Sequence, residues 1–155
     1  MATAAGDAKK TITLRSSDGE EFEVEEAAAK QSKTLTNIIE DGCADGGIPV
    51  SNVTGKVLAK VLEYCKKHAD SAATEEEIAA WDYEYINVEQ DVLYEVIVAS
   101  NYLNIKSLLE LGCRGAADMI KGRTPAEIRQ WFKIPNDFSA EELREVKREM
   151  LWAFE

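Results

Sequence analysis

Few residues of this chain have side chains suited to catalysis or metal binding. The candidates are three cysteines, Cys43, Cys65 and Cys113, and a single histidine, His68. The cysteines are far apart and include no C-x-x-C pair, whereas a zinc site needs four clustered nitrogen and sulfur ligands. A Cys–His or Ser–His pair could recruit only His68, which follows a lysine-rich segment and is expected to be solvated. We therefore expect no metal ion and no cofactor.

Known catalytic motifs are missing as well. The chain lacks G-x-x-x-x-G-K-[ST], G-x-G-x-x-G, G-x-S-x-G and H-E-x-x-H. The sequence motifs of nucleotide-binding proteins, serine hydrolases and zincins are therefore missing. The run of glutamates at 75–77 lacks the EF-hand pattern and is expected to be solvated. Cys113 lies on an apolar stripe and is interpreted as a small core residue. We expect no catalytic residue; a thiol enzyme using Cys113 is kept as an alternative.

The charge of the chain restricts its partners. There are 29 acidic and 18 basic residues, for a formal net charge of −11. Such a chain repels phosphate backbones and anionic membranes, so we expect no nucleic acid and no membrane among its partners. Basic or neutral protein surfaces are favoured instead. The 155 residues suffice for one domain, or one domain with an appendage.

The N-terminal residues 1–10 are small and polar, without the apolar core of a secretory signal. We expect this stretch to be disordered. No 18-residue apolar run exists that could span a membrane, and the cysteine usage suits a reducing compartment. The sequence thus predicts a soluble intracellular protein.

The first half of the chain predicts a small sheet and amphipathic helices. Residues 11–15 and 22–25 alternate polar and apolar side chains around the turn signal SSDG, which is typical of a β-hairpin. A helix is expected over 27–39. An extended piece follows at 48–50, where Pro49 favours a sheet edge. A helix over 56–67 carries an apolar stripe.

The stretch 69–80, rich in Ala, Ser, Thr and Glu, is predicted to be a mobile acidic loop. The helix expected over 89–103 is apolar on every side, which predicts a central core helix buried on all sides, either by this domain alone or with a partner that completes one end. A helix follows over 105–121, ended by Gly122. The order of elements predicts an α+β fold that is mostly helical.

Two short helices are predicted near the C-terminus. Thr124 and Glu127 form a capping-box pattern with Pro125 between them, and Ser139 can cap the last helix. Helices this short are not stable alone and need a surface to lie on. The tail that follows, residues 150–155, exposes Trp152 and Phe154 at the end of the chain. It either binds another protein or folds back onto its own domain, and the residues alone leave both possibilities open.

Several stretches together resemble one family, the Skp-type adaptor subunits of SCF ubiquitin ligases, in a plant-like form. These stretches are SSDGE (16–20), FEV (22–24), IPVSNV (48–53), ASNYLNI (99–105), DMIKGRTP (118–125), NDF (136–138) and WAFE (152–155). The resemblance covers roughly residues 10–155 in register.

The resemblance implies a BTB/POZ-type domain over 11–122 and a C-terminal helical extension over 123–155. It implies a non-enzymatic adaptor, in the nucleus and cytoplasm, that bridges a cullin to F-box substrate receptors and so promotes ubiquitination and proteasomal degradation. No small-molecule substrate of its own is implied. The cullin surface should use Asn101 and Tyr102. The F-box surface should use Leu93, Ile97, Ala116, Ile128, Phe132, Ile134, Phe138 and Trp152.

The chain departs from the family pattern at a few positions. Met150 and Leu151 replace a polar pair, Trp131 replaces a smaller residue, and Pro135 and Ala140 are atypical. These departures bear on which F-box proteins are accepted. A BTB-like domain that only self-associates is a second alternative to the adaptor, although the two closing helices and Trp152 argue against it.

Overall fold

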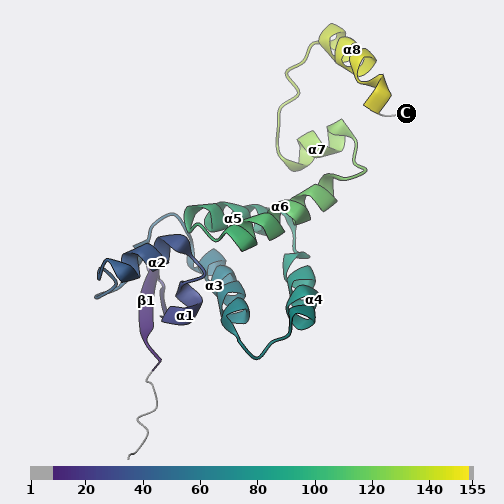
Figure 1. Cartoon of the computed structure of the whole chain (residues 1–155). Helices are drawn as coiled ribbons and strands as arrows, with labels where there is room; N and C mark the ends of the chain where they lie inside the picture. Colours follow the sequence, from purple (N-terminus) through teal and green to yellow (C-terminus); the bar gives the residue numbers. More distant parts are fainter. Residues whose placement is uncertain (1–8, 154–155) are drawn as a thin grey trace, which may run out of the picture. The chain divides into compact units, whose positions relative to one another are not determined.

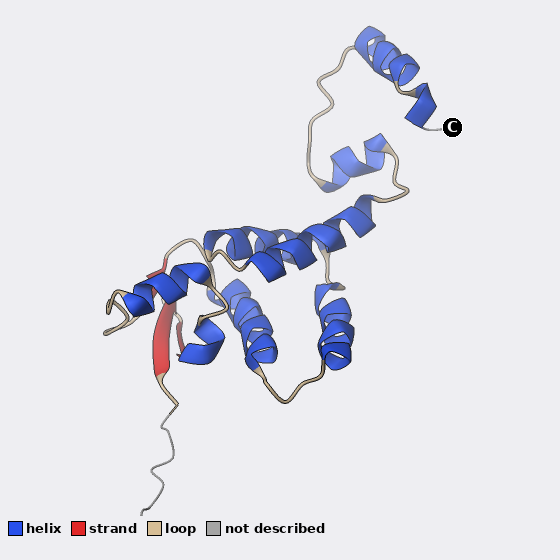
Figure 2. Cartoon of the chain, viewed as in Figure 1, coloured by secondary structure: helices blue, strands red, loops and turns tan. Residues whose placement is uncertain are grey.

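The computed structural model describes residues 9–153, and its contacts divide the chain into two compact units, Met1–Met119 and Ile120–Glu155. We call them the N-terminal unit and the C-terminal unit. Figure 1 labels the elements along the chain, and Figure 2 shows that helices dominate and that the described strands are confined to the N-terminal unit. The α+β class predicted from the sequence is therefore confirmed, whereas the predicted disorder of residues 1–10 falls largely outside the described residues.

The N-terminal unit contains a three-stranded sheet in the order β2-β1-β3. β1 (Thr11–Ser16) pairs antiparallel with β2 (Glu21–Glu25), so the predicted hairpin is confirmed. Gly19 allows its turn with a φ of +84°. β3 (Ile48–Val50) pairs with β1 in parallel, with Leu14 opposite Ile48, and Pro49 lies on this edge strand as expected.

The core of the N-terminal unit lies between this sheet and α3 (Gly55–Ala69). Leu14 and Val24 from the sheet are buried, as are Leu58 and Val61 from α3. The apolar stripe predicted over 56–67 is thus the buried face of α3.

The single helix expected over 27–39 is in fact two. α1 (Glu26–Ala29) and α2 (Lys33–Glu40) are separated at Ser32, whose Oγ accepts a hydrogen bond from the Leu35 amide at 3.1 Å. The same hydroxyl donates to the Leu103 carbonyl. A serine that caps one helix and reaches a distant carbonyl ends the preceding helix, and apolar periodicity cannot reveal this break.

The acidic stretch 69–80 is not a loop throughout, because α4 (Glu75–Ile86) begins inside it. Thr74 and Glu77 form a capping box, in which the Glu77 amide donates to Thr74 Oγ1 at 3.2 Å and the Thr74 amide donates to Glu77 Oε2 at 2.9 Å. Acidic residues in a first turn also favour the helix dipole. The T-x-x-E pattern is visible in the sequence and was outweighed there by the polar composition.

α4 is attached to α3 by aromatic and polar contacts. Tyr85 donates its hydroxyl to the Lys60 carbonyl at 2.7 Å, and the ring of Tyr85 lies 5.7 Å from that of Tyr64 on α3. His68 is not a solvated side chain as expected: its Nε2 lies 2.7 Å from Asp82 Oδ1, and its ring stacks on Tyr64 at 4.0 Å.

α5 (Gln90–Tyr102) and α6 (Lys106–Ile120) complete the N-terminal unit. The expectation that α5 is buried on all sides is wrong, since Tyr94, Val98 and Tyr102 are 60%, 47% and 39% exposed. The expectation for Cys113 is wrong too, because that residue is exposed on α6.

The C-terminal unit contains α7 (Pro125–Trp131), α8 (Ala140–Glu149) and the 3-10 turn η1 (Leu151–Ala153). Both predicted N-caps are confirmed as full capping boxes, Thr124 with Glu127 and Ser139 with Glu142. No described residue of either helix is buried. No described helix of the chain combines the length and apolar character needed to cross a membrane.

Candidate partner-binding surfaces

The outward face of α5 is an apolar stripe. Tyr94, Val98 and Tyr102 are four residues apart, so they lie on one face of the helix. Leu93, Val96 and Ala99 lie on the opposite side and are buried. Composition cannot distinguish these two faces, because both are apolar. We call Tyr94, Val98 and Tyr102 the α5 stripe; its first two members are residues that the sequence analysis did not assign to any surface.

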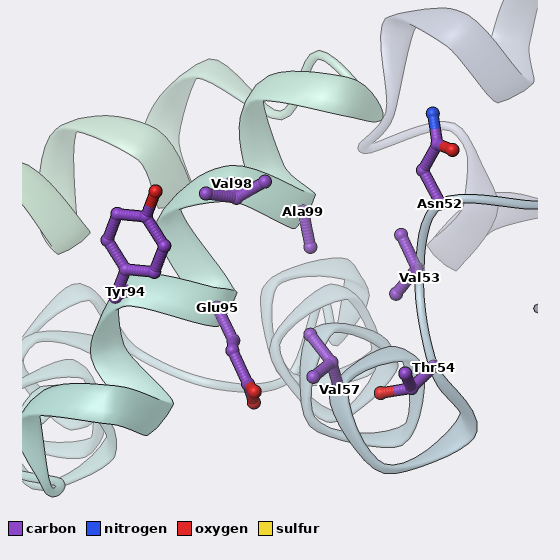
Figure 3. Close-up of a pocket in the computed structure, with 8 residues that line it drawn as sticks. All are labelled: Asn52, Val53, Thr54, Val57, Tyr94, Glu95, Val98 and Ala99. Carbon is purple, nitrogen blue, oxygen red and sulfur yellow. The ribbon is translucent and has the colours of Figure 1, made fainter.

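A pocket of about 210 Å³ opens beside the α5 stripe. Figure 3 shows side chains from three segments around it: the loop before α3, the first turn of α3, and α5. The lining residues are Asn52, Val53, Thr54, Val57, Tyr94, Glu95, Val98 and Ala99. The lining is mainly apolar and has one carboxylate, which suits an inserted apolar side chain better than a reactive substrate.

The helices α5 and α6 approach each other closely at Gly112, where an added Cβ would lie 2.6 Å from Ile97 Cγ1. Gly115 of α6 instead allows a close approach to α4, because a Cβ there would lie 2.8 Å from Ile86 Cγ1. Leu93 is only 2% exposed, so in the chain by itself it packs internally and presents no surface. Ile97 and Ala116 are half-buried. Of the eight predicted F-box contacts, these three belong to the N-terminal unit.

The predicted cullin contacts, Asn101 and Tyr102, lie together and exposed in the last turn of α5. The turn that ends this helix is well defined: Asn104 adopts a left-handed conformation with a φ of +52°, and the Ile105 amide donates to the Ser100 carbonyl at 2.9 Å. The start of α2 also meets this end, since the Lys33 amide donates to the Asn104 carbonyl at 3.1 Å. Backbone hydrogen bonds therefore fix the backbone from which both side chains project.

The other five predicted F-box contacts belong to the C-terminal unit. Phe132, Ile134 and Phe138 are 42%, 53% and 46% exposed, Trp152 is 77% exposed, and Ile128 is half-buried. Exposed apolar groups at this density mark a surface that a partner covers. Phe154 of the predicted tail lies outside the described residues.

The titratable groups do not form a reactive centre. Burial raises the pKa of Cys65 to about 12, which keeps this residue a neutral thiol. Backbone amides of Thr74, Thr124 and Ser139 lower the pKa values of Glu77, Glu127 and Glu142, which serve as caps. Among residues 9–153, no group of three or more histidine, cysteine or acidic side chains is placed to hold a metal ion.

Comparison with known proteins identifies the class to which these surfaces belong. Residues 10–70 match the model of the Skp1 family tetramerisation domain, and residues 106–153 match that of the Skp1 family dimerisation domain. The chain is 52% identical to SKP1-like protein 1A of Arabidopsis thaliana, covering 94% of this chain and 98% of that protein. It is 52% identical to SKP1-like protein 1 of Oryza sativa subsp. japonica, with 98% and 99% covered.

The chain therefore belongs to the Skp1 family, and its fold is a Skp1-type POZ domain followed by C-terminal helices. It is a non-catalytic adaptor of an SCF-type ubiquitin ligase. The resemblance stated from the sequence is confirmed, and the thiol-enzyme alternative is dropped.

Proposed function

We propose that this adaptor bridges a cullin scaffold to F-box substrate receptors, so that receptor-bound proteins are ubiquitinated and degraded by the proteasome. The observation that carries the proposal is the unburied apolar surface of the C-terminal unit: Phe132, Ile134, Phe138 and Trp152 are each more than 40% exposed. An F-box domain that covers these side chains would supply the core that this unit lacks.

The cullin contact is assigned to a different place, the last turn of α5. Asn101 and Tyr102 are exposed there on a backbone fixed by hydrogen bonds to α2 and by the turn at Asn104. Because this backbone is already ordered, binding there does not have to order a loop, and only the side chains lose freedom. The two contacts should therefore be separable by mutation. We also propose that the protein works in the nucleus and cytoplasm, which fractionation of the tagged chain would test.

The double variant Asn101→Lys with Tyr102→Lys tests the cullin assignment. Two ammonium groups would have to lose water in a packed interface, so cullin binding should fall at least tenfold, while binding to an F-box domain should be unchanged. Titration with the purified cullin N-terminal region and, separately, with an F-box domain measures both. Equal loss of both partners would instead show that the variant is unfolded.

A matched control is available on α4. Tyr83 is 76% exposed and Asn87 is exposed at the end of the same helix, so Tyr83→Lys with Asn87→Lys makes the same chemical change elsewhere. This control should bind both partners normally. If it loses cullin binding as the Asn101 and Tyr102 variant does, the effect comes from added positive charge and the assignment is wrong.

Size-exclusion chromatography with and without an F-box domain tests the alternative in which the protein only self-associates. In that alternative no complex with the F-box domain forms.

A further inference from the structure

An arginine and a tryptophan stack on each other at the start of the C-terminal unit. The guanidinium carbon of Arg123 lies 4.6 Å from the centre of the Trp131 ring, within the range of a cation–π interaction. Trp131 is only partly exposed, whereas the next residue, Phe132, is 42% exposed. Trp131 is also the position where this chain departs from the smaller residue of the family pattern.

The local backbone directs Arg123 onto this ring. Gly122 takes a φ of +75°, and the Arg123 amide donates to the Ile120 carbonyl at 3.1 Å, so the chain turns sharply after α6. Thr124 then caps α7. Glu127 and Trp131 are four residues apart and share one face of α7. The hydrogen bonds from Thr124 lower the pKa of Glu127, and the charge of Arg123 contributes a smaller part in the same direction.

α7 needs stabilising contacts beyond the helix propensity of its residues, and the stack supplies one of them. The helix has seven residues and no buried side chain, and isolated helices of this length are marginal. Its far end is closed by a turn in which the Ile134 amide donates to the Arg129 carbonyl at 2.9 Å. The capping box and this turn secure the two ends, and the stack ties Arg123, which precedes the cap, to the last turn of the helix.

We propose that the Arg123–Trp131 stack is a positioning device that keeps α7 folded in the free chain, so that Ile128, Phe132 and Ile134 are presented together to the F-box domain. Arg123 and Trp131 are positioning residues here and do not themselves contact the partner. The inference rests on the proposed F-box binding for its purpose, while the stack itself can be tested in the free protein.

The first measurement is the helix population of α7 in the full chain, taken from Cα chemical shifts of residues 125–131. Arg123→Gln should lower the helix–coil constant of α7 by about two- to fivefold. Trp131→Leu should lower it similarly, although leucine is the better helix former. The double variant should be no worse than the worse single variant, because the two side chains form one interaction.

Lys121→Gln is the matched control. It removes the same charge two residues away, and loss of a cation near a helix N-terminus should leave α7 unchanged or slightly more stable. If the stack stabilises α7, Arg123→Gln should instead lower the helix population of α7. If Arg123→Gln behaves like Lys121→Gln, or if the single effects simply add in the double variant, the proposal is wrong.

The second measurement is affinity for an F-box domain. Each single variant should weaken binding by the factor by which it lowers the helix population of α7, because only the folded fraction presents the three apolar residues together. If Trp131→Leu weakens binding far more than it lowers the helix population, Trp131 is a direct contact and the positioning role is wrong. If the unmodified chain binds no F-box domain, the proposed function fails, and the chemical shifts still decide whether the stack holds α7.

Discussion

The N-terminal and C-terminal units use the same device to begin a helix and differ in what happens afterwards. Capping boxes start α4 in the first unit and both α7 and α8 in the second. α4 then packs on α3 through Trp81 and Tyr85, whose rings lie 6.3 Å and 5.7 Å from that of Tyr64, whereas no described residue of α7 or α8 is buried. Local signals thus specify helices equally well in both units, and only tertiary burial separates a core from a partner surface.

The two units therefore differ in what they expose. The N-terminal unit completes its own core, and Asn101 and Tyr102 project from an ordered backbone on its surface. The C-terminal unit keeps large apolar groups in water, and burial of such groups is worth about 1.5–3 kcal/mol each. That energy is available to binding.

The largest expected effect is a core truncation. Leu58 of α3 is 0% exposed, so Leu58→Ala should cost about 2–5 kcal/mol of unfolding free energy through lost contacts and the cavity left behind. Leu151→Ala is the matched change in the C-terminal unit, where the side chain is 59% exposed, and should cost no more than about 0.5 kcal/mol. Urea unfolding measures both; equal losses would mean that the C-terminal unit has a core of its own.

Trp152 tests whether the exposed apolar surface of the C-terminal unit contributes to F-box binding. Trp152→Ala should weaken F-box affinity by about 2–4 kcal/mol, roughly 30-fold or more, with domain stability nearly unchanged because the ring is 77% exposed. Tyr83→Ala, at 76% exposure in the N-terminal unit, should change neither quantity. A large stability loss with unchanged affinity would mean that the tail packs into its own domain. Titration with an F-box domain and urea unfolding are run on the same samples.

The sequence predicted most of the elements because their signals are local. The hairpin, the buried face of α3 and the caps at Thr124 and Ser139 each depend on side chains a few residues apart. The same reasoning failed at Ser32, where a contact with the distant Leu103 carbonyl decides the helix boundary. It also failed at α4, where composition was given more weight than the pattern of Thr74 and Glu77.

The site was predicted less completely than the fold. Periodicity could not tell the exposed residues of α5, Tyr94 and Val98, from the buried Leu93, because all three are apolar and the difference depends on where α3 and α6 pack. His68 was misjudged for a related reason, since its partner Asp82 comes from another helix. Surfaces defined by exposure require the tertiary arrangement, whereas caps and turns do not.

Replacing the capping threonine by alanine should have different effects on stability in the two units. Thr74→Ala should lower the unfolding free energy by about 1 kcal/mol, because α4 is packed on α3 and its cap supports the global fold. Thr124→Ala should lower the helix population of α7 and leave global urea unfolding unchanged. Circular dichroism during the titration and Cα shifts of residues 125–131 distinguish the two. If the urea midpoint of Thr74→Ala is unchanged, the start of α4 does not contribute to global stability, and residues 69–80 behave as the mobile loop that their composition predicts.

The smallest expected effect concerns two left-handed residues that end equivalent turns. Asn104 closes α5 with a φ of +52°, and Lys133 closes α7 with a φ of +54°. Asparagine adopts this conformation at a lower energetic cost than lysine, so Lys133→Asn should stabilise α7 by roughly 0.5 kcal/mol, and Asn104→Lys should destabilise the N-terminal unit by a similar amount. The first change is measured by Cα shifts of residues 125–131 and the second by urea unfolding.

Lys147→Asn, inside α8, is the control. It should destabilise its helix, whereas Lys133→Asn should stabilise α7, because asparagine is the poorer helix former within a helix. A loss of helix in Lys133→Asn would mean that the lysine side chain stabilises the turn by more than its backbone conformation costs.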